Sequence, residues 1–214
     1  MKRTICMYSM LLAFIVLFAS GCAVGNKHRY HDVIANVNVS DSIGAGIATH
    51  DQREYVISGK KNPNFVGLSR GGYGNTFDVG TVSGRNLADD MTEAITSSLS
   101  KKGYKAIPVI VSYSDDQNAV LEKLKATEAR RLILLTLHEW KSDTYTNTAL
   151  IFNLTLKVFD QSGQVLADKQ IQGRDNLKGS VMNPPKHAKK VVPIAFRQKI
   201  EELFNDPAVE KNLH

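Results

Sequence analysis

The fold is decided by residues 150–171, which read LIFNLTLKVFDQSGQVLADKQI. Apolar and polar side chains alternate from Leu150 to Val158, the period expected of a strand that buries one face. Asp160-Gln161-Ser162-Gly163 is typical of a hairpin turn, and apolar residues alternate again from Val165 to Ile171. These residues predict an antiparallel hairpin with one face covered by other elements.

Further strands are predicted upstream of this hairpin. They cover residues 43–49, 104–111 and 132–135, with residues 53–58 as another extended piece. Leu132-Ile133-Leu134-Leu135 is apolar on both faces, which is typical of a central strand. Residues 60–84 carry six glycines among many apolar residues, which indicates an ordered loop or irregular hairpin rather than a flexible linker.

Helical periodicity appears in two places between these strands. Apolar residues recur at every fourth position from Leu87 to Leu99, which predicts a helix over residues 85–102. Ser114 and Gln117 have the spacing of a capping box, ahead of a second helix that ends near Arg130.

A third helix is predicted over residues 187–204, and Pro193 inside it predicts a late start or a kink. The elements then run strand, helix, strand, helix, three strands, helix. This order predicts an α+β fold: a two-layer sandwich with helices on one face of a mixed β-sheet.

The N-terminus has the parts of a bacterial export signal, because Lys2 and Arg3 precede an apolar run from Ile5 to Ala19. Ala19-Ser20-Gly21-Cys22 resembles the lipobox of bacterial lipoproteins. The resemblance implies cleavage between Gly21 and Cys22 and acylation of the Cys22 thiol. An ordinary secretory signal or an uncleaved anchor is the alternative, although the apolar run is short for a membrane span.

Four parts are therefore expected: a signal peptide over 1–21, the acylated cysteine and a tether over 22–42, one periplasm-facing domain over 43–205, and a C-terminal tail over 206–214. Weak alternation over residues 33–39 suits a tether or an edge strand. In enterobacterial lipoproteins an aspartate after the cysteine favours retention at the inner membrane. Ala23 at that place implies the outer membrane.

Candidates for catalysis are sparse, since no nucleophile elbow, zinc-protease helix, phosphate loop or C-x-x-C pair occurs. We assign no catalytic residue, no metal site and no cofactor apart from lipid on Cys22. His28 and His31 lie in the predicted tether, where no packed surroundings would orient an imidazole. His50-Asp51 and His138-Glu139 pair an imidazole with a carboxylate, but neighbours on a strand point to opposite faces.

Candidate partner-binding residues are Arg70, Tyr73 and Trp140. Arg70-Gly71-Gly72-Tyr73-Gly74-Asn75 is either a structural turn or a loop that grips an anion or an aromatic surface. Trp140 lies where a strand leaves the core, either as an exposed anchor or as a buried residue. The formal net charge of +6 is thinly spread, so it indicates solvated surface or contact with anionic lipid or cell-wall material. We expect no nucleic-acid partner.

The chain resembles the small YajG-type envelope lipoproteins. The resemblance rests on the lipobox, the helix ending Leu99-Ser100-Lys101-Lys102-Gly103-Tyr104, the apolar strand from Leu132, and the final hairpin and helix. More loosely, it is similar to outer-membrane lipoproteins that assist secretion, flagellar ring assembly or peptidoglycan synthases. Only Cys22 carries over residue by residue, and the glycine-rich stretch over 60–84 departs from the family.

The expected function is a non-enzymatic binding or scaffolding role at the outer membrane, with an envelope protein or a peptidoglycan-associated partner. The sheet edge and the loop around Arg70 and Tyr73 would carry it. One alternative is a hydrolase or transferase acting on cell-wall or lipid material through His50, Asp51 or His138, which requires both histidines beside one cleft. The other is an apolar small-molecule carrier, which requires a cavity between helices and sheet.

Overall fold

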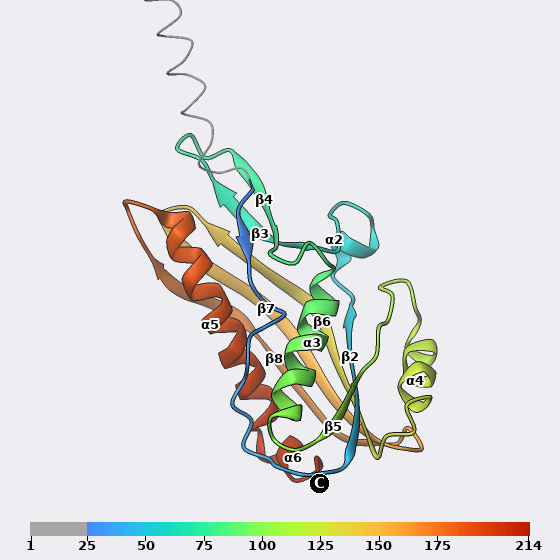
Figure 1. The fold of residues 1–214 in the computed structure, drawn as a ribbon. Helices are drawn as coiled ribbons and strands as arrows, with labels where there is room; N and C mark the ends of the chain where they lie inside the picture. The colour runs from blue at the N-terminus through green and yellow to red at the C-terminus, as the bar shows by residue number, and fades with distance from the viewer. Residues whose placement is uncertain (1–24) are drawn as a thin grey trace, which may run out of the picture.

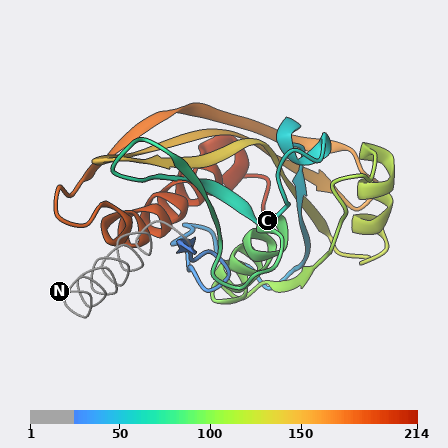
Figure 2. The ribbon, with the colours of Figure 1, turned by 90° about the horizontal axis from the view of Figure 1, so that it is seen from above.

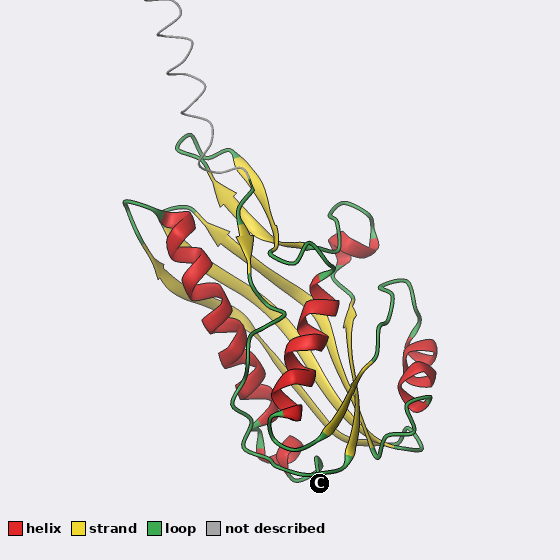
Figure 3. Cartoon of the chain, viewed as in Figure 1, coloured by secondary structure: helices red, strands yellow, loops and turns green. Residues whose placement is uncertain are grey.

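Helices and one mixed sheet make up residues 25–214, the part of the chain that the computed structural model describes (Figure 1, Figure 3). The α+β class is confirmed. The predicted signal peptide, its cleavage site at Gly21 and Cys22, and the lipid site at Cys22 lie outside the described residues.

The sheet is strongly curled and has eight strands among the described residues (Figure 2). They are β1 (Lys27–His28), β2 (Gly44–Asp51), β3 (Phe65–Arg70), β4 (Thr76–Thr81), β5 (Lys105–Pro108), β6 (Arg131–Thr144), β7 (Asn147–Asp160) and β8 (Val165–Gly179). Their order is β1-β4-β3-β6-β2-β5, with β7 on the other edge of β6 and β8 beyond β7. The predicted hairpin is thus β7–β8, and the glycine-rich stretch forms the antiparallel β3–β4 hairpin.

Two strands share one edge of β6. β2 pairs in parallel with Arg131–Leu137, and β3 pairs in parallel with Ser142–Thr144. The buried Arg53 side chain lies between the two pairings, where its Nη1 donates to the carbonyl oxygens of Phe65 (2.6 Å) and Trp140 (3.2 Å). The predicted extended piece over 53–58 is wrong, because the chain turns away from the sheet at Arg53 into the short helix α2 (Glu54–Ile57).

The sheet has a large core on one face and a smaller one on the other. The longer helices α3 (Leu87–Ser100) and α5 (Pro184–Phe204) pack on the first face, together with Ile133 and Leu135. Helix α4 (Gln117–Lys125) packs on the opposite face against Leu132 and Leu134. This arrangement explains why residues 132–135 are apolar on both sides, as predicted for a central strand.

Both predicted boundaries of the helix α4 are wrong. Asp116, not Ser114, caps α4, because its carboxylate accepts a hydrogen bond from the Ala119 amide at 2.8 Å. α4 ends at Lys125 rather than near Arg130, since the chain adopts a left-handed conformation (φ 53°) at Glu128.

Helix α5 begins earlier than predicted, at Pro184. Two prolines occupy its first turn, where no backbone amide is needed, and the Asn183 side chain accepts from the Lys186 amide at 3.0 Å. The late start predicted from Pro193 is therefore wrong. Pro193 lies inside the helix.

The predicted tether packs against the domain over the residues that are described. Residues 29–42 run between α3 and α5 (Figure 1), and we call them the strap. Its Tyr30, Val37 and Val39 side chains are buried. Its backbone amides donate to side chains of both helices: Ala35 to Ser98, Asn36 to Glu201 and Asn38 to Asn205. Since Asn26 and His28 are buried as well, the packed part of the chain begins at about residue 26 rather than at 43.

The predicted C-terminal tail is also part of the domain. Helix α6 (Pro207–Glu210) follows α5 directly, with the Asp206 carboxylate accepting from the Ala208 amide at 2.9 Å. Val209 and Leu213 are fully buried, and the Leu213 carbonyl accepts from the Tyr104 hydroxyl at 3.0 Å. The packed domain therefore reaches almost to the last residue. Within residues 25–214, no helix has both the length and the apolar character that a membrane crossing requires.

Candidate partner-binding face

Beyond the small core under α4, the face of β6, β7 and β8 that points away from α3 and α5 is mostly polar. In β7, Leu154 and Leu156 join the large core, so the alternate residues Asn153, Thr155 and Lys157 point to the other side. The registers of β6–β7 and β7–β8 place polar residues of three strands side by side there. We call this surface the open face; its members are Lys141, Asp143, Ile151, Asn153, Thr155, Lys157, Asp168, Gln170, Gln172 and Arg174.

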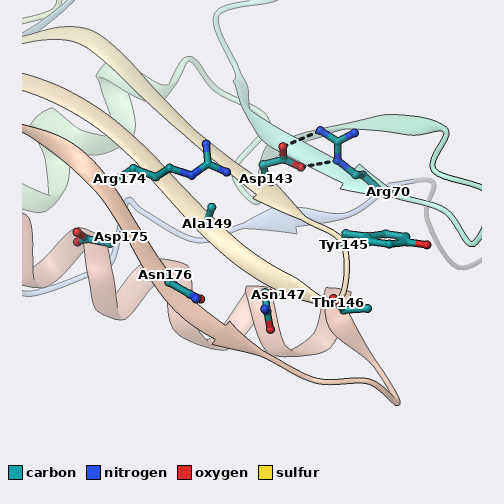
Figure 4. Close-up of a pocket in the computed structure, with 9 residues that line it drawn as sticks. All are labelled: Arg70, Asp143, Tyr145, Thr146, Asn147, Ala149, Arg174, Asp175 and Asn176. Atoms are coloured by element: carbon teal, nitrogen blue, oxygen red, sulfur yellow. Dashed lines mark hydrogen bonds and ion pairs between the residues drawn. The ribbon is translucent and has the colours of Figure 1, made fainter.

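One hollow of about 350 Å³ lies at the end of the open face near the β6–β7 turn (Figure 4). We call it the Arg70 hollow; it is lined by Arg70, Asp143, Tyr145, Thr146, Asn147, Ala149, Arg174, Asp175 and Asn176. β3 supplies Arg70, and the other walls come from β8, from the adjoining ends of β6 and β7 and from the turn between them. The pairing of β3 with β6 brings Arg70 beside this turn, although more than seventy residues separate them in sequence.

Arg70 lies in the hollow but is engaged by a carboxylate. Its Nε and Nη2 donate to the two Asp143 oxygens at 2.8 and 2.7 Å, and these hydrogen bonds hold the pKa of Asp143 below its ordinary value. Arg70, which is predicted to bind an anion, thus binds the Asp143 carboxylate of the same chain. Arg174 reaches over Ala149 toward Asp143 (Figure 4) and forms no ion pair within 4 Å among residues 25–214. It is the better placed of the two guanidinium groups to bind a partner's carboxylate.

The two aromatic candidates have opposite environments. Tyr73 stands at the tip of the β3–β4 hairpin and is fully exposed. Trp140 is fully buried, donates from Nε1 to the Tyr30 hydroxyl at 3.0 Å and packs edge-on against Phe196. Trp140 points to the core face of β6, so it is a structural residue rather than an exposed anchor.

A second hollow of about 570 Å³ lies at the other end of the open face, beside the loop that precedes α4. We call it the His50 hollow. It is lined by His50, Gln52, Asp115, Asp116, Gln117, Leu134, Thr136, His138, Thr155, Lys157, Asp168 and Gln170. His50 and His138 therefore lie beside one cleft, as the hydrolase alternative requires. Asp51 points away from it and is buried against Arg53.

The two histidines are held by neutral groups. His50 Nε2 lies 2.8 Å from the Gln52 amide nitrogen, and burial lowers the pKa of His50. His138 Nε2 lies 3.2 Å from the Thr155 hydroxyl. Neither ring is hydrogen-bonded to a side-chain carboxylate in the described chain, so no third group of a catalytic triad orients it.

The other histidine pair lies in packed surroundings, contrary to the prediction for a tether. His28 is buried with Nε2 3.0 Å from the Ser142 hydroxyl, and His31 Nδ1 lies 4.0 Å from Asp90. Burial lowers the pKa of His28 to about 4. No group of three or more metal-ligating side chains occurs among residues 25–214.

Sequence reasoning missed Arg174 and the His50 hollow. Both depend on three strands lying side by side in a given register, which no local pattern reveals. The available signal was the alternation itself, because the polar members of residues 153–157 and 168–174 all had to share the face opposite the core.

The fold is similar to that of a DUF330-family protein from Xanthomonas campestris. The TM-score is 0.55 at 12% identity, over 87% of this chain and 96% of that chain. Weaker similarities link it to a PelC dodecamer from Paraburkholderia phytofirmans (TM-score 0.38, 14% identity, 81% and 94% covered) and to lipoprotein GNA1162 from Neisseria meningitidis (0.32, 10%, 75% and 99%). At these identities the similarity concerns the fold alone. No protein-family model and no curated relative matches the chain.

Proposed function

We propose that the chain is a lipid-anchored, periplasm-facing lipoprotein of the outer membrane that binds an envelope protein through its open face and does not catalyse a reaction. The observation that carries the proposal is the open face itself. It spans three long strands and contains two polar hollows. The outer edge of β8 pairs with no other described strand, since β8 pairs with β7 alone.

The free edge of β8 supports a protein partner in particular. An unpaired edge presents a row of backbone donors and acceptors that an extended segment of another protein can pair with. Exposed Gln170, Gln172 and Arg174 lie along the same strand and can add side-chain contacts. Polar and charged contacts of this kind contribute more to the specificity of binding than to its affinity.

The lipid anchor and the outer-membrane address rest on the lipobox ending at Cys22 and on Ala23 after it. The carrier alternative has less support. A gap between the strap, α3 and α5, lined by Val33, Ala94 and Phe196 among others, has essentially no volume for a water-sized molecule.

A hydrolase is the second candidate, since His50 and His138 share a hollow and His138 contacts a hydroxyl. In that case Thr155→Val and His138→Gln would abolish turnover of cell-wall or ester substrates by the purified protein. Under the main proposal the purified wild-type protein turns over no such substrate, so neither variant has an activity to lose.

Site-specific photocrosslinking in cells tests the main proposal. A photoreactive amino acid is placed at Gln172 on the open face and, as a matched control, at exposed Gln198 on α5. We expect a discrete crosslinked protein from position 172 and none from position 198. Arg174→Glu, combined with the label at position 172, should weaken that crosslink.

Equal crosslinking from both positions, or none from position 172, would contradict the open face as the binding surface. The anchor is tested separately by the mass of the purified chain, which must include acyl groups on Cys22. Replacing Cys22 with Ser should release the protein from the membrane without changing its fold.

A further inference from the structure

Three loops meet at the end of the domain where β1 begins (Figure 1). They cover residues 71–75, 145–146 and 180–183, and we call them the tip loops. The Tyr145 hydroxyl donates to the Gly72 carbonyl at 3.5 Å, and the Ser180 amide donates to the Thr146 carbonyl at 3.2 Å. These bonds connect the loops into one surface. The C-terminus lies at the opposite end of the domain (Figure 1).

The tip loops carry the three most exposed large apolar side chains among residues 25–214. Tyr73 is 104% exposed, Met182 93% and Val181 87%, whereas the next, Ile110, is 62% exposed. Tyr145, at 48%, lies beside them. Apolar side chains that project fully into solvent from adjoining loops are costly for a monomer and mark an interaction surface.

The charge beside these apolar tips is positive. Residues 176–190 contain Lys178, Lys186, Lys189 and Lys190, all exposed, and no acidic residue. The nearby carboxylate of Asp143 is engaged by Arg70. Apolar and aromatic tips flanked by lysines are the composition that binds the interface of a bilayer containing anionic lipid.

The short segment between Cys22 and Asn26 keeps this end of the domain close to the predicted lipid site. Asn26 lies at the tip end, because its side-chain nitrogen donates to the Ser69 hydroxyl at 3.3 Å, next to the β3–β4 turn. Four residue steps separate Asn26 from Cys22, which span at most about 14 Å when fully extended. An acyl chain on Cys22 would therefore hold this end of the domain near the headgroups.

We infer that the tip loops dock onto an anionic phospholipid surface, with Tyr73, Val181 and Met182 in the headgroup region. The inference rests on acylation of Cys22, as proposed above. Docking fixes the orientation of the domain: β6, β7 and β8 run away from the bilayer, and the open face looks sideways, accessible to a partner in the periplasm.

Fluorescence quenching on vesicles tests this docking. The acylated full chain is reconstituted into vesicles of phosphatidylcholine with or without phosphatidylglycerol. Both cysteines of the sequence lie at positions 6 and 22, so a thiol introduced by Tyr73→Cys or Met182→Cys can be labelled selectively with a polarity-sensitive dye. Ile110→Cys, an exposed apolar site outside the tip loops, is the matched control.

We expect dyes at positions 73 and 182 to shift to the blue and to be quenched by spin-labelled lipid, and the dye at position 110 to show neither effect. Phosphatidylglycerol should strengthen the shift, and Lys178→Glu with Lys186→Glu should reverse that gain. Because the vesicles contain no other protein, a quenched dye reports contact with lipid.

Flotation of the same samples separates the two proposals. If the protein floats with the vesicles but the tip dyes behave like the one at position 110, the anchor stands and tip docking is wrong. If the shift is the same with and without phosphatidylglycerol, anionic headgroups are not what the tips recognise. A protein that carries no lipid and does not float overturns both proposals.

Discussion

Arg53 and Asp51 form a bidentate ion pair in the interior of the domain. The Arg53 Nε donates to Oδ1 of Asp51 at 2.8 Å and its Nη2 donates to Oδ2 at 2.6 Å, while both side chains are almost fully buried. The remaining guanidinium hydrogens bond to carbonyl groups of Pro63, Phe65 and Trp140. The pair thereby joins β2, β3 and β6 at the place where the β6 edge has no strand partner.

Removing one member of this pair should be strongly destabilising. Asp51→Asn leaves a buried guanidinium without its countercharge, and we expect the free energy of unfolding to fall by about 3–5 kcal/mol. Denaturant unfolding followed by the fluorescence of Trp140 measures this. The control is Asp78→Asn, which breaks the exposed Lys61–Asp78 pair and should cost at most about 1 kcal/mol. Equal losses in the two variants would show that burial of the first pair is unimportant.

Gly67 is required by the close approach of β3 to β6. A Cβ at this position would lie 2.5 Å from the Ser142 carbonyl oxygen and would also meet the Ser142 side chain. Gly67→Ala should therefore separate the strands and destabilise the domain by at least about 1 kcal/mol. Thermal unfolding gives the comparison with Gly72→Ala, where a Cβ would meet nothing within 4 Å. An unchanged melting temperature for Gly67→Ala would contradict this packing.

His28 should make stability depend on pH. Burial lowers its pKa from 6.5 to about 4, so the unfolded chain binds a proton more readily than the folded one between these values. The free energy of unfolding should therefore fall as the pH is lowered from about 6.5 toward 4, by a few kcal/mol at most. Unfolding curves over this range, compared with those of His28→Gln, measure the effect.

The His28→Gln variant should show a shallower pH dependence. Some slope should remain, because burial also lowers the pKa of His50. An identical slope in the wild type and in His28→Gln would show that His28 can accept a proton in the folded state.

The strap should depend on Tyr30, whose hydroxyl accepts the Trp140 indole hydrogen bond at 3.0 Å. Tyr30→Phe leaves the buried indole N–H without that acceptor, and we expect a loss of about 1–3 kcal/mol. Hydrogen exchange should show faster opening of residues 33–39, which pack beside it. Tyr113→Phe, at a site 40% exposed, is the control and should change neither quantity.

Local periodicity was sufficient for the long elements. The strand around Leu154 and the helix around Met91 were predicted because their apolar residues recur with the period of the structure they form. The strand around Leu132 was predicted from a continuous apolar run, which is typical of burial on both faces. The prediction for residues 53–58 was wrong, since their conformation is set by the buried Arg53–Asp51 pair and by the hydrogen bond of Arg53 to the Trp140 carbonyl rather than by their own propensities. The prediction of a tether or edge strand over the strap was wrong for a similar reason. Val37 and Val39 resemble a weak strand, but α3 and α5, far away in sequence, bury them.

The residues of the candidate site, too, could be predicted from the sequence only in part. Sequence alone indicated Arg70 and Tyr73 in a glycine-rich turn, and the structure places them in a hollow and at an exposed tip. Trp140 was ambiguous because an alternating strand does not reveal its register near a bulge, and β6 is irregular between Leu137 and Glu139.

The sequence by itself determined the order of the longer elements, the apolar faces that must be covered, and the lipobox from which an anchor is expected, because each is written in neighbouring residues. Only the tertiary structure decided which polar side chains share the open face, that Arg70 is engaged by Asp143, and that the three tip loops adjoin the start of β1. These relationships depend on how strands far apart in the chain pair with one another, and the burial of apolar surface from the whole domain selects that pairing.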